Sequence, residues 1–417
     1  MEIVTERELE NRFGALPWGE PRAVVSGNFA TPHRLMDLFD AAVESYRVFM
    51  LNAQRPVPTR AGVVPETPFV GPAMRDLPGL DYLPMRLSLV PRLFDVARPP
   101  DVVLVHTSAV RAGKVSLGAE VNILPAAIER ARARNGLVVA QVNARMPYTF
   151  GDGELDLDLI DLAIEVDEDL AAPIRRPVSD ETAAIGTGVA SLVEDGSTIQ
   201  VGIGEVPDAV LASLVRFRGI GVWTEAVSDG LLELEHAGAL EEDQPIVTTF
   251  LFGSPELYAW VDANPRVRVL RTETVNNPST ISSRRLMCSI NTALQVDLRE
   301  QANASFVRGR IYSGFGGQPD FVVGALHSDG GHAVIALPSW HSKSDTSTIV
   351  DHLDEPVTSF QHSAVVTEQG RAMIFGRSQR AQARLLIEQA AHPAAREALW
   401  ESARLAMANE GNSRSAD

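Results

Sequence analysis

The sequence is poor in cysteine and in positive charge. Cys288 is the only cysteine among the 417 residues, which excludes an internal disulfide framework and fits a reducing compartment. Aspartate and glutamate outnumber lysine and arginine by 54 to 37, which gives a formal net charge of −17. Because nucleic acids and anionic membranes bind basic surfaces, we expect neither as a partner. An anionic substrate must then be attracted by local basic residues or by helix N-termini.

Long apolar segments are also missing. No apolar run approaches the roughly 20 residues that a membrane helix needs. The first residues, MEIVTERELENRFG, are acidic and helix-like rather than typical of a signal peptide. We therefore expect a cytoplasmic protein.

Three common catalytic patterns are absent as well. The nine histidines show neither H-x-x-x-H nor H-E-x-x-H spacing, so no metal site is predicted. No G-x-S-x-G elbow occurs, which argues against a serine hydrolase. Cys288 lies in the apolar run LMCSI, where a buried, inert thiol is the expected state.

The first half of the chain alternates strand-like and helix-like segments. Residues 99–110 and 137–143 read as buried strands, and residues 124–136 between them read as a helix that Gly136 ends. This order implies parallel strands joined by right-handed crossovers. A chain of 417 residues is too long for one ordinary domain, so the fold class expected is α/β with two open parallel-sheet domains.

A Pro- and charge-rich passage, DEDLAAPIRRPVSDET, interrupts the alternation and is the best candidate for a domain boundary. We predict an N-terminal domain at 1–172, a linker at 173–182, a C-terminal domain at 183–408 and a frayed tail at 409–417. Further strands are expected in STIQVGIG, IGVWTE, IVTTFLFG, VIALP and SAVVTE, and the last segment predicts a helical hairpin broken near Pro393.

Two glycine-rich segments could line a site. Gly202 and Gly204 lie between a predicted strand and a predicted helix, where backbone N–H groups can approach an anion, although a lone G-x-G more often forms only a tight turn. Gly314, Gly316 and Gly317 make the segment IYSGFGGQPDF a poor helix and a poor strand. That segment is either a mobile loop or a backbone nest that offers N–H donors, and the residues alone leave both open.

Glu225 follows the apolar run IGVW directly in GVWTEAVSDG. Ligands of open α/β sheets bind beyond the carboxyl ends of the strands, where this carboxylate would lie. A solvated acid at a strand end is the commoner arrangement, so Glu225 on its own does not identify a site.

Taken in order, these segments resemble the acetyl-CoA hydrolase/transferase family. The resemblance covers most of the chain and is carried by VNARMPYTFGDGELDLDLIDLAIEVDE (142–168), SLVEDGSTIQVGIGEVPDAVLASL (191–214), GVWTEAVSDG, INTALQVDL (290–298), SGFGGQPDF, VIALPS and VVTEQG. Several separate motifs in family order are far more specific than any one of them.

The resemblance implies a fold, a mechanism and partners. It implies two α/β domains with the active site between them, and Glu225 as the covalent nucleophile. The glycine segments would line this site, with oxyanion-hole N–H groups from Ile203 and from Gly316 or Gly317. Acyl-CoA and a small carboxylic acid would be the substrates, coenzyme A would be a substrate rather than a tightly bound cofactor, and a homodimer or larger homo-oligomer is expected.

Some positions depart from the family pattern. Trp223 stands where a small or polar residue is usual, and strand alternation predicts that it is buried away from the site. Thr348 replaces an arginine, and a second arginine expected before VVTE is absent. The basic residues that could compensate are Arg111, Lys114, Arg308 and Lys343.

The sequence is compatible with four functions. The leading hypothesis is transfer of coenzyme A between an acyl-CoA and a free acid through a glutamyl-CoA thioester on Glu225. The nearest alternative is an acyl-CoA hydrolase that uses the same anhydride with water as acceptor, and a remoter one is a CoA-binding protein without turnover. A nicotinamide-dependent dehydrogenase comes last, because Pro207 occupies the place of the third glycine in the dinucleotide fingerprint.

Overall fold

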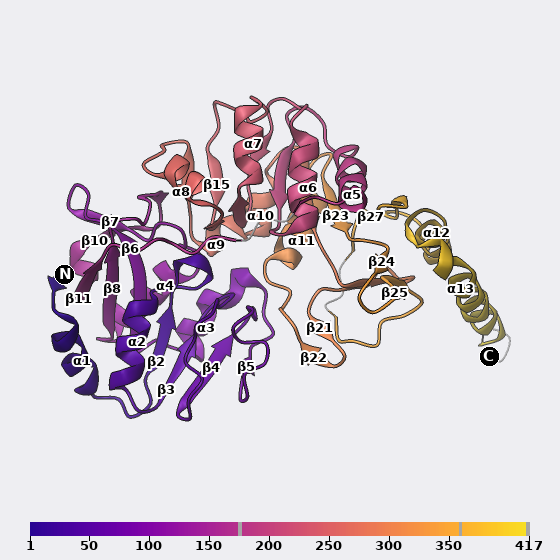
Figure 1. Cartoon of the computed structure of the whole chain (residues 1–417). Helices are drawn as coiled ribbons and strands as arrows, with labels where there is room; N and C mark the ends of the chain where they lie inside the picture. The colour runs from indigo at the N-terminus through magenta and orange to yellow at the C-terminus, as the bar shows by residue number, and fades with distance from the viewer. Residues whose placement is uncertain (174–176, 358–360, 414–417) are drawn as a thin grey trace.

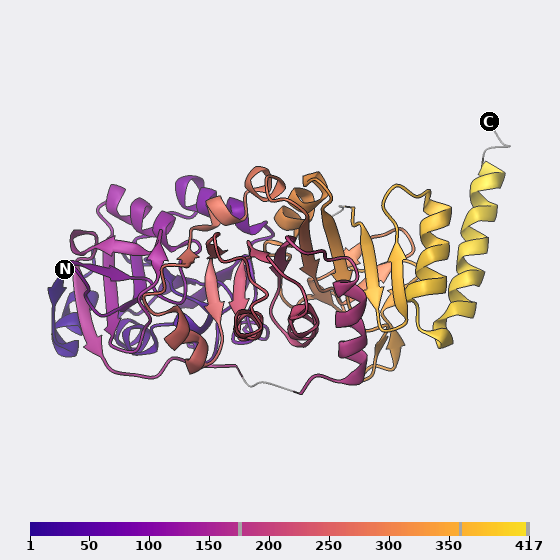
Figure 2. The same ribbon diagram turned by 90° about the horizontal axis from the view of Figure 1, so that it is seen from above.

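The computed structural model describes residues 1–173, 177–357 and 361–413. Two α/β domains lie side by side in an elongated molecule, with α1 and α13 at opposite ends (Figure 1, Figure 2). This arrangement confirms the predicted two-domain fold with parallel sheets. No helix in the described part of the chain has the length and apolar character required to cross a membrane.

The N-terminal sheet has eight parallel strands in the order β1-β11-β8-β6-β2-β3-β4-β5. Strands β6 and β8 at its centre are buried along almost their whole length, as their β-branched runs predict. The strands are β1 (Glu2–Ile3), β2 (Arg22–Val25), β3 (Tyr46–Phe49), β4 (Val63–Thr67), β5 (Asp81–Tyr82), β6 (Val102–Ser108), β8 (Leu137–Asn143) and β11 (Leu162–Val166), and the helices are α1 (Glu6–Gly14), α2 (His33–Ala42), α3 (Val90–Val96) and α4 (Leu124–Ala133).

The C-terminal sheet has six strands in the order β13-β12-β18-β23-β27-β28, all parallel except the last pair. Its strands are β12 (Thr198–Val201), β13 (Gly221–Val222), β18 (Met287–Asn291), β23 (His332–Ala336), β27 (Ala364–Thr367) and β28 (Gly370–Met373). Its helices are α5 (Asp180–Ala190), α6 (Glu205–Leu214), α7 (Gly230–His236), α8 (Pro255–Val261), α9 (Thr272–Val275), α10 (Pro278–Ser282) and α11 (Gln318–His327).

Smaller sheets connect the two domains and extend the C-terminal domain. A three-stranded parallel sheet combines β15 (Ile246–Thr248) and β17 (Val267–Val269) with β9 (Phe150–Gly151) from the first half of the chain. A two-stranded sheet pairs β14 (Ala226–Ser228) with β16 (Phe250–Phe252). One apolar cluster includes residues of both main sheets, so the domains share a core. The remaining strands are β7 (Lys114–Ser116), β10 (Glu154–Asp156), β19 (Gln295–Asp297), β20 (Ala302–Asn303), β21 (Phe306–Val307), β22 (Arg310–Ile311), β24 (Trp340–His341), β25 (Thr346–Ser347) and β26 (Ile349–Val350).

The C-terminal hairpin is confirmed, with a later end than predicted. Helix α12 (Gln379–Leu385) and a short π-helical segment precede the break, and α13 (Pro393–Ser413) begins at the predicted proline. Helix α13 reaches Ser413 and so overlaps the first five residues of the predicted frayed tail 409–417, which stays a prediction. An established helix adds one hydrogen bond for each residue it incorporates, so it can extend through unfavourable residues. Residues 414–417 lie outside the described residues.

The start of α5 bears on the predicted linker. Ser179 caps α5 by accepting a hydrogen bond from the backbone of Thr182, so the helix begins inside the predicted linker 173–182. Residues 174–176 of that linker lie outside the described residues, and the domain limits stay a prediction.

Candidate active site

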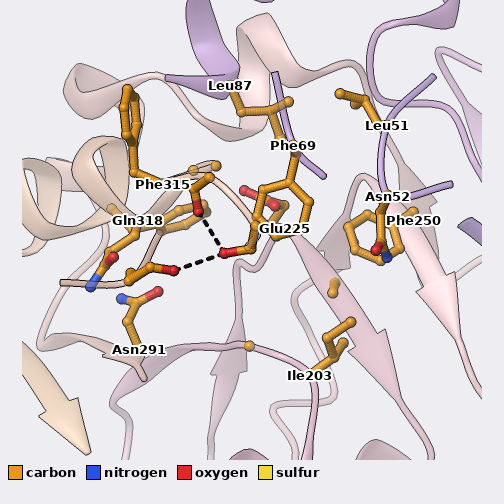
Figure 3. A pocket seen from close by; sticks show the side chains of 18 of the residues that line it. Leu51, Asn52, Phe69, Leu87, Ile203, Glu225, Phe250, Asn291, Phe315 and Gln318 are labelled. Atoms are coloured by element: carbon orange, nitrogen blue, oxygen red, sulfur yellow. Dashed lines mark hydrogen bonds between the residues drawn. The ribbon is translucent and has the colours of Figure 1, made fainter. Parts of the chain in front are cut away.

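A cavity of about 970 Å³, including the open space at its mouth, lies between the two domains (Figure 3). Its N-terminal wall comes from loops that follow the carboxyl ends of β2, β3 and β4, and its C-terminal wall from residues that follow β12, β13 and β18. Strand ends of both sheets therefore converge on one space, which is where open α/β sheets bind ligands. Its lining includes Asn28, Leu51, Asn52, Phe69, Leu87, Asn122, Gln200, Gly202, Ile203, Glu225, Phe250, Asn291, Gly314, Gly316, Gly317 and Gln318.

Glu225 lies in the interruption between β13 and β14, and its backbone is held firmly. Its carbonyl oxygen accepts hydrogen bonds from the backbone N–H groups of Thr249 and Phe250, at 3.0 and 3.2 Å. The hydroxyls of Thr248 and Thr249 donate to the same oxygen, at 3.0 and 2.8 Å. These four bonds also explain why the predicted strand IVTTFLFG is two short strands, β15 and β16, broken at Thr249.

The Glu225 carboxylate faces the cavity and has one side-chain donor in the part of the chain that the structure describes. Nδ2 of Asn276 donates to its Oε2 at 2.8 Å, and Oδ1 of Asn276 accepts from the Thr272 hydroxyl at 3.2 Å. Burial raises the pKa of Glu225 to about 7, the Asn276 hydrogen bond opposes this rise, and the charge of Asp320 adds to it. The carboxylate is therefore more basic than an exposed glutamate.

The second glycine segment packs against Glu225 and against the N-terminal domain. A Cβ added at Gly317 would overlap Glu225 Oε2 and Asn276 Nδ2, so only glycine fits there. Gly316 has a φ of 51°, and its carbonyl accepts from Leu87 N–H at 2.9 Å. Between β22 and α11 the segment is a loop that ends at Gly317, and the expectation of a poor helix beyond it is wrong. Gln318 begins α11, because proline is tolerated in the first turn of a helix.

The first glycine segment lies on another wall of the cavity. Gly202 and Ile203 line the cavity, whereas Gly204 does not. Gly204 precedes α6 and has a φ of 122°, a backbone conformation that favours glycine. A Cβ added there would meet no atom within 4 Å, so the conformation and not a close contact explains the glycine. In the described part of the chain, the N–H groups of Ile203, Gly316 and Gly317 donate to no other protein group. The oxyanion role of these three amides stays a prediction.

Several polar residues of the cavity were not predicted. Oε1 of Gln200 accepts hydrogen bonds from the Ser289 hydroxyl and from Nδ2 of Asn291, at 2.7 and 3.2 Å. These bonds hold the side-chain amides of Gln200 and Asn291 together in the cavity wall. Asn291 ends β18, so the rule that placed Glu225 at a strand end could also have found it. Asn28 and Asn52 follow β2 and β3 in the same way.

The basic residues proposed to replace the missing arginines do not reach this site. None of Arg111, Lys114, Arg308 and Lys343 lines the cavity, and its described lining contains no lysine, arginine or histidine. Lys114 instead pairs with Asp156 at 2.9 Å.

Two other expectations concern buried side chains. Trp223 is buried outside the cavity, where its Nε1–H donates to Val275 O at 2.9 Å, as strand alternation predicts. Burial raises the pKa of the Cys288 thiol to about 12, which leaves it an inert core residue. In the described residues, no group of three or more His, Cys, Asp or Glu side chains could hold a metal ion.

Comparison with known proteins places these features in a family. Residues 253–403 match the family model of the acetyl-CoA hydrolase/transferase C-terminal domain. The 4-hydroxybutyrate coenzyme A transferase of Clostridium kluyveri is 39% identical over 346 residues, which cover 79% of this chain and 80% of that protein. RipA from Yersinia pestis superposes with a TM-score of 0.90 at 26% identity, over 97% of this chain and 98% of that one. A 4-hydroxybutyrate CoA-transferase from Porphyromonas gingivalis superposes with a TM-score of 0.81 at 31% identity, over 97% of each chain.

Proposed function

Because the chain belongs to the acetyl-CoA hydrolase/transferase family, we propose that it transfers coenzyme A between an acyl-CoA and a free carboxylic acid, with Glu225 as covalent nucleophile. The observation that carries this proposal is the position of the Glu225 carboxylate. It lies in a cavity between two domains. Within the described ranges it faces glycine segments with unused N–H groups and has a single side-chain donor.

The first half of the reaction uses only the carboxylate and the thioester. Glu225 attacks the acyl carbonyl, a C–O bond forms, and the C–S bond breaks to release CoA thiolate and a mixed anhydride. The thiolate then attacks the glutamyl carbonyl and displaces the first carboxylate, which leaves a glutamyl-CoA thioester. A second carboxylic acid, as its carboxylate, runs these two steps in reverse and departs as the new acyl-CoA.

The surroundings of Glu225 support each step. Desolvation makes the carboxylate a stronger base, which favours attack on a carbonyl carbon. Each tetrahedral intermediate carries an oxyanion, and a well-aimed backbone N–H stabilises such a charge by roughly 3 kcal/mol. We assign this role to the amides of Ile203 and of Gly316 or Gly317. Gly202 and Gly314 shape the same walls, and Gly204 sets the turn into α6.

The chemistry requires no metal and no resident cofactor. All bonds exchanged are those of carboxylates and thioesters, and coenzyme A enters and leaves as part of the substrates. Enzyme dialysed against a chelator should therefore keep its full activity. We also propose a cytoplasmic location and a homodimer or larger homo-oligomer, to be tested by cell fractionation and by light scattering of the purified protein.

The decisive experiment is intact-protein mass spectrometry after brief incubation with acetyl-CoA and other acyl-CoAs. The wild type should gain the mass of coenzyme A at Glu225, and a free carboxylate should remove it again. Glu225→Gln preserves the shape of the side chain and should form no adduct, whereas Glu242→Gln, at an exposed site, should behave as wild type. Release of CoA without any adduct, and without stimulation by a carboxylate, would instead identify a hydrolase.

A further inference from the structure

The glycine loop beside the proposed nucleophile is held from its other side by the N-terminal domain. Near the start of the loop, Val70 N–H donates to Ser313 O at 2.6 Å. A Cβ added at Gly316 would approach the ring of Phe69 to 3.0 Å, so the two domains are in close contact here. Figure 3 shows Phe69 on the side of the cavity that the N-terminal domain forms. The position of the loop therefore depends on contacts across the domain boundary.

A second segment of the N-terminal domain, Arg86–Ser88, binds the end of the loop and the start of α11. We call it the clamp segment. Leu87 N–H donates to Gly316 O at 2.9 Å. The hydroxyl and the N–H of Ser88 donate to the buried carboxylate of Asp320, at 2.7 and 3.1 Å. Nη1 of Arg86 lies 3.7 Å from the same carboxylate. Three consecutive residues thus hold the point at which the loop becomes a helix.

The hydrogen bond from Leu87 also fixes the direction of the Gly317 N–H. The Gly316 carbonyl and the Gly317 N–H belong to one peptide unit, which is trans, because the one cis bond in the described ranges is Arg55–Pro56. In a trans peptide the carbonyl and the N–H point in opposite directions. With the carbonyl bound to the N-terminal domain, the N–H must point away from Leu87.

Gly317 is the residue of the loop that packs against the proposed nucleophile. An added Cβ would meet Glu225 Oε2 at Gly317, whereas at Gly316 it would meet only the Phe69 ring. The Gly317 N–H donates to no other group in the described part of the chain. It also lies at the N-terminus of α11, where the helix dipole adds positive partial charge. Of the two glycines, Gly317 is therefore the better placed to stabilise an oxyanion formed at Glu225.

We propose that the clamp segment positions the Gly317 amide for oxyanion stabilisation: Leu87 N–H orients the peptide, and Ser88 fixes the start of α11 through Asp320. This inference rests on the proposed function and identifies positioning residues for the same site. The C-terminal domain supplies the nucleophile, and the N-terminal domain orients a donor that stabilises the charge developed on the substrate.

The Leu87 N–H can be removed by a single substitution. Leu87 is the first residue of the short 3₁₀ helix Leu87–Leu89, a position at which proline is tolerated. Arg86 has φ −73° and ψ 149°, the extended conformation that a residue before proline adopts. Leu87→Pro should therefore keep the backbone and lose the donor. Leu87→Ala keeps the N–H and measures the contribution of the side chain.

We expect kcat of Leu87→Pro to be about 100-fold below that of Leu87→Ala, the cost of losing one oxyanion donor. KM for the acyl-CoA should change little, because the oxyanion exists only after the ground state. Rates are compared at pH 8.5, above the pKa of about 7 of Glu225, so that its protonation does not contribute. Equal kcat values in the two variants would overturn the proposal.

A proline elsewhere controls for the substitution itself. Gln379 is the exposed first residue of α12 and follows Ser378, which has φ −66° and ψ 154°. Gln379→Pro should therefore retain the wild-type kcat and KM.

Ser88 provides a second test that decides the question even if Leu87→Pro fails to fold. Ser88→Ala removes the hydroxyl donor to Asp320 and should lower kcat about tenfold, the value of one hydrogen bond to a charged group. Ser88→Thr keeps the hydroxyl and should restore most of this loss. A melting temperature that falls in Ser88→Ala without any change in kcat would make Ser88 a structural residue and refute its positioning role.

The Glu225 adduct separates this inference from the function on which it rests. If the wild type forms the adduct and the Leu87 and Ser88 variants turn over at the wild-type kcat, the clamp segment has no positioning role while CoA transfer stands. If the wild type gives neither adduct nor turnover, the proposed function fails and this inference with it.

Discussion

The Glu225 carboxylate and the Asn276 amide form a hydrogen bond of 2.8 Å between residues 51 positions apart. Asn276 follows the short helix α9 and is completely buried. Among the described residues it is the single side-chain donor to this desolvated carboxylate, and it opposes the rise in pKa that burial causes. The hydrogen bond therefore favours the ionised form of the proposed nucleophile.

Replacing Asn276 with alanine should therefore weaken the nucleophile in a pH-dependent way. Without the donor, the pKa of Glu225 should rise further, because the hydrogen bond stabilises the charged form. At pH 7 we expect the rate of adduct formation to fall about 10- to 100-fold, the value of a hydrogen bond to a charged group. The acid limb of the pH–rate profile should move to higher pH.

A neighbouring residue provides the control for this prediction. Asn277 is exposed and accepts a hydrogen bond from Ser279 N–H at the start of α10, away from Glu225. Asn277→Ala should leave the pH profile unchanged. An unmoved acid limb in Asn276→Ala would contradict the role assigned to the amide.

In the wild type, formation of the glutamyl-CoA adduct should increase with pH, with a midpoint near pH 7. The ionised form of Glu225 is the nucleophile, and burial raises its pKa to about 7. Single-turnover rates measured from pH 5.5 to 8.5 in rapid-quench experiments would give the midpoint. A profile that is flat above pH 5 would mean that the carboxylate is solvated.

The raised pKa of Glu225 also means that its ionisation lowers the free energy of unfolding. Its folded value of about 7 lies above the ordinary value of 4.5, so the folded state binds the proton more tightly than the unfolded state. Stability must then be lost as pH rises from about 4.5 to 7. The stability difference between Glu225→Gln and the wild type should therefore shift in favour of the variant by about 3 kcal/mol in the free energy of unfolding from pH 4 to pH 8.

Denaturant titrations at the two pH values would measure this difference. Glu242→Gln, on an exposed loop, should show no such pH-dependent gain. Equal pH dependence in Glu225→Gln and the wild type would show that Glu225 is not desolvated in the folded protein.

Gly317→Ala should lower turnover by roughly two orders of magnitude, with a modest effect on stability. The added Cβ would overlap Glu225 Oε2 and Asn276 Nδ2, and both side chains would have to move. A misplacement of about 1 Å can cost on the order of 100-fold in rate. Gly19→Ala is the matched control, because a Cβ there meets no atom within 4 Å. A melting temperature that falls before activity does would make Gly317 a structural residue.

The sequence predicts those site residues that belong to contiguous motifs better than those that only the fold brings together. The motif around Glu225 and the segment ending at Gly317 can each be recognised from neighbouring residues alone. Asn276 does not, because its partner lies 51 residues away and nothing in VNNP indicates a contact. The hydrogen bond between Asn28 and Asn52 in the cavity wall is found only when β2 and β3 are known to be neighbours, which depends on strand order.

Asp320→Asn should move the acid limb in the direction opposite to Asn276→Ala. Asp320 is buried at the start of α11 and accepts from the Ser88 N–H and hydroxyl, at 3.1 and 2.7 Å, across the domain boundary. Its negative charge raises the pKa of Glu225, so an uncharged isostere should lower that pKa and extend adduct formation to more acidic pH. Asp329→Asn, at an exposed site, should leave the profile where it is. General damage to the site would reduce the rate in both variants, but only an electrostatic effect on Glu225 shifts the two profiles in opposite directions.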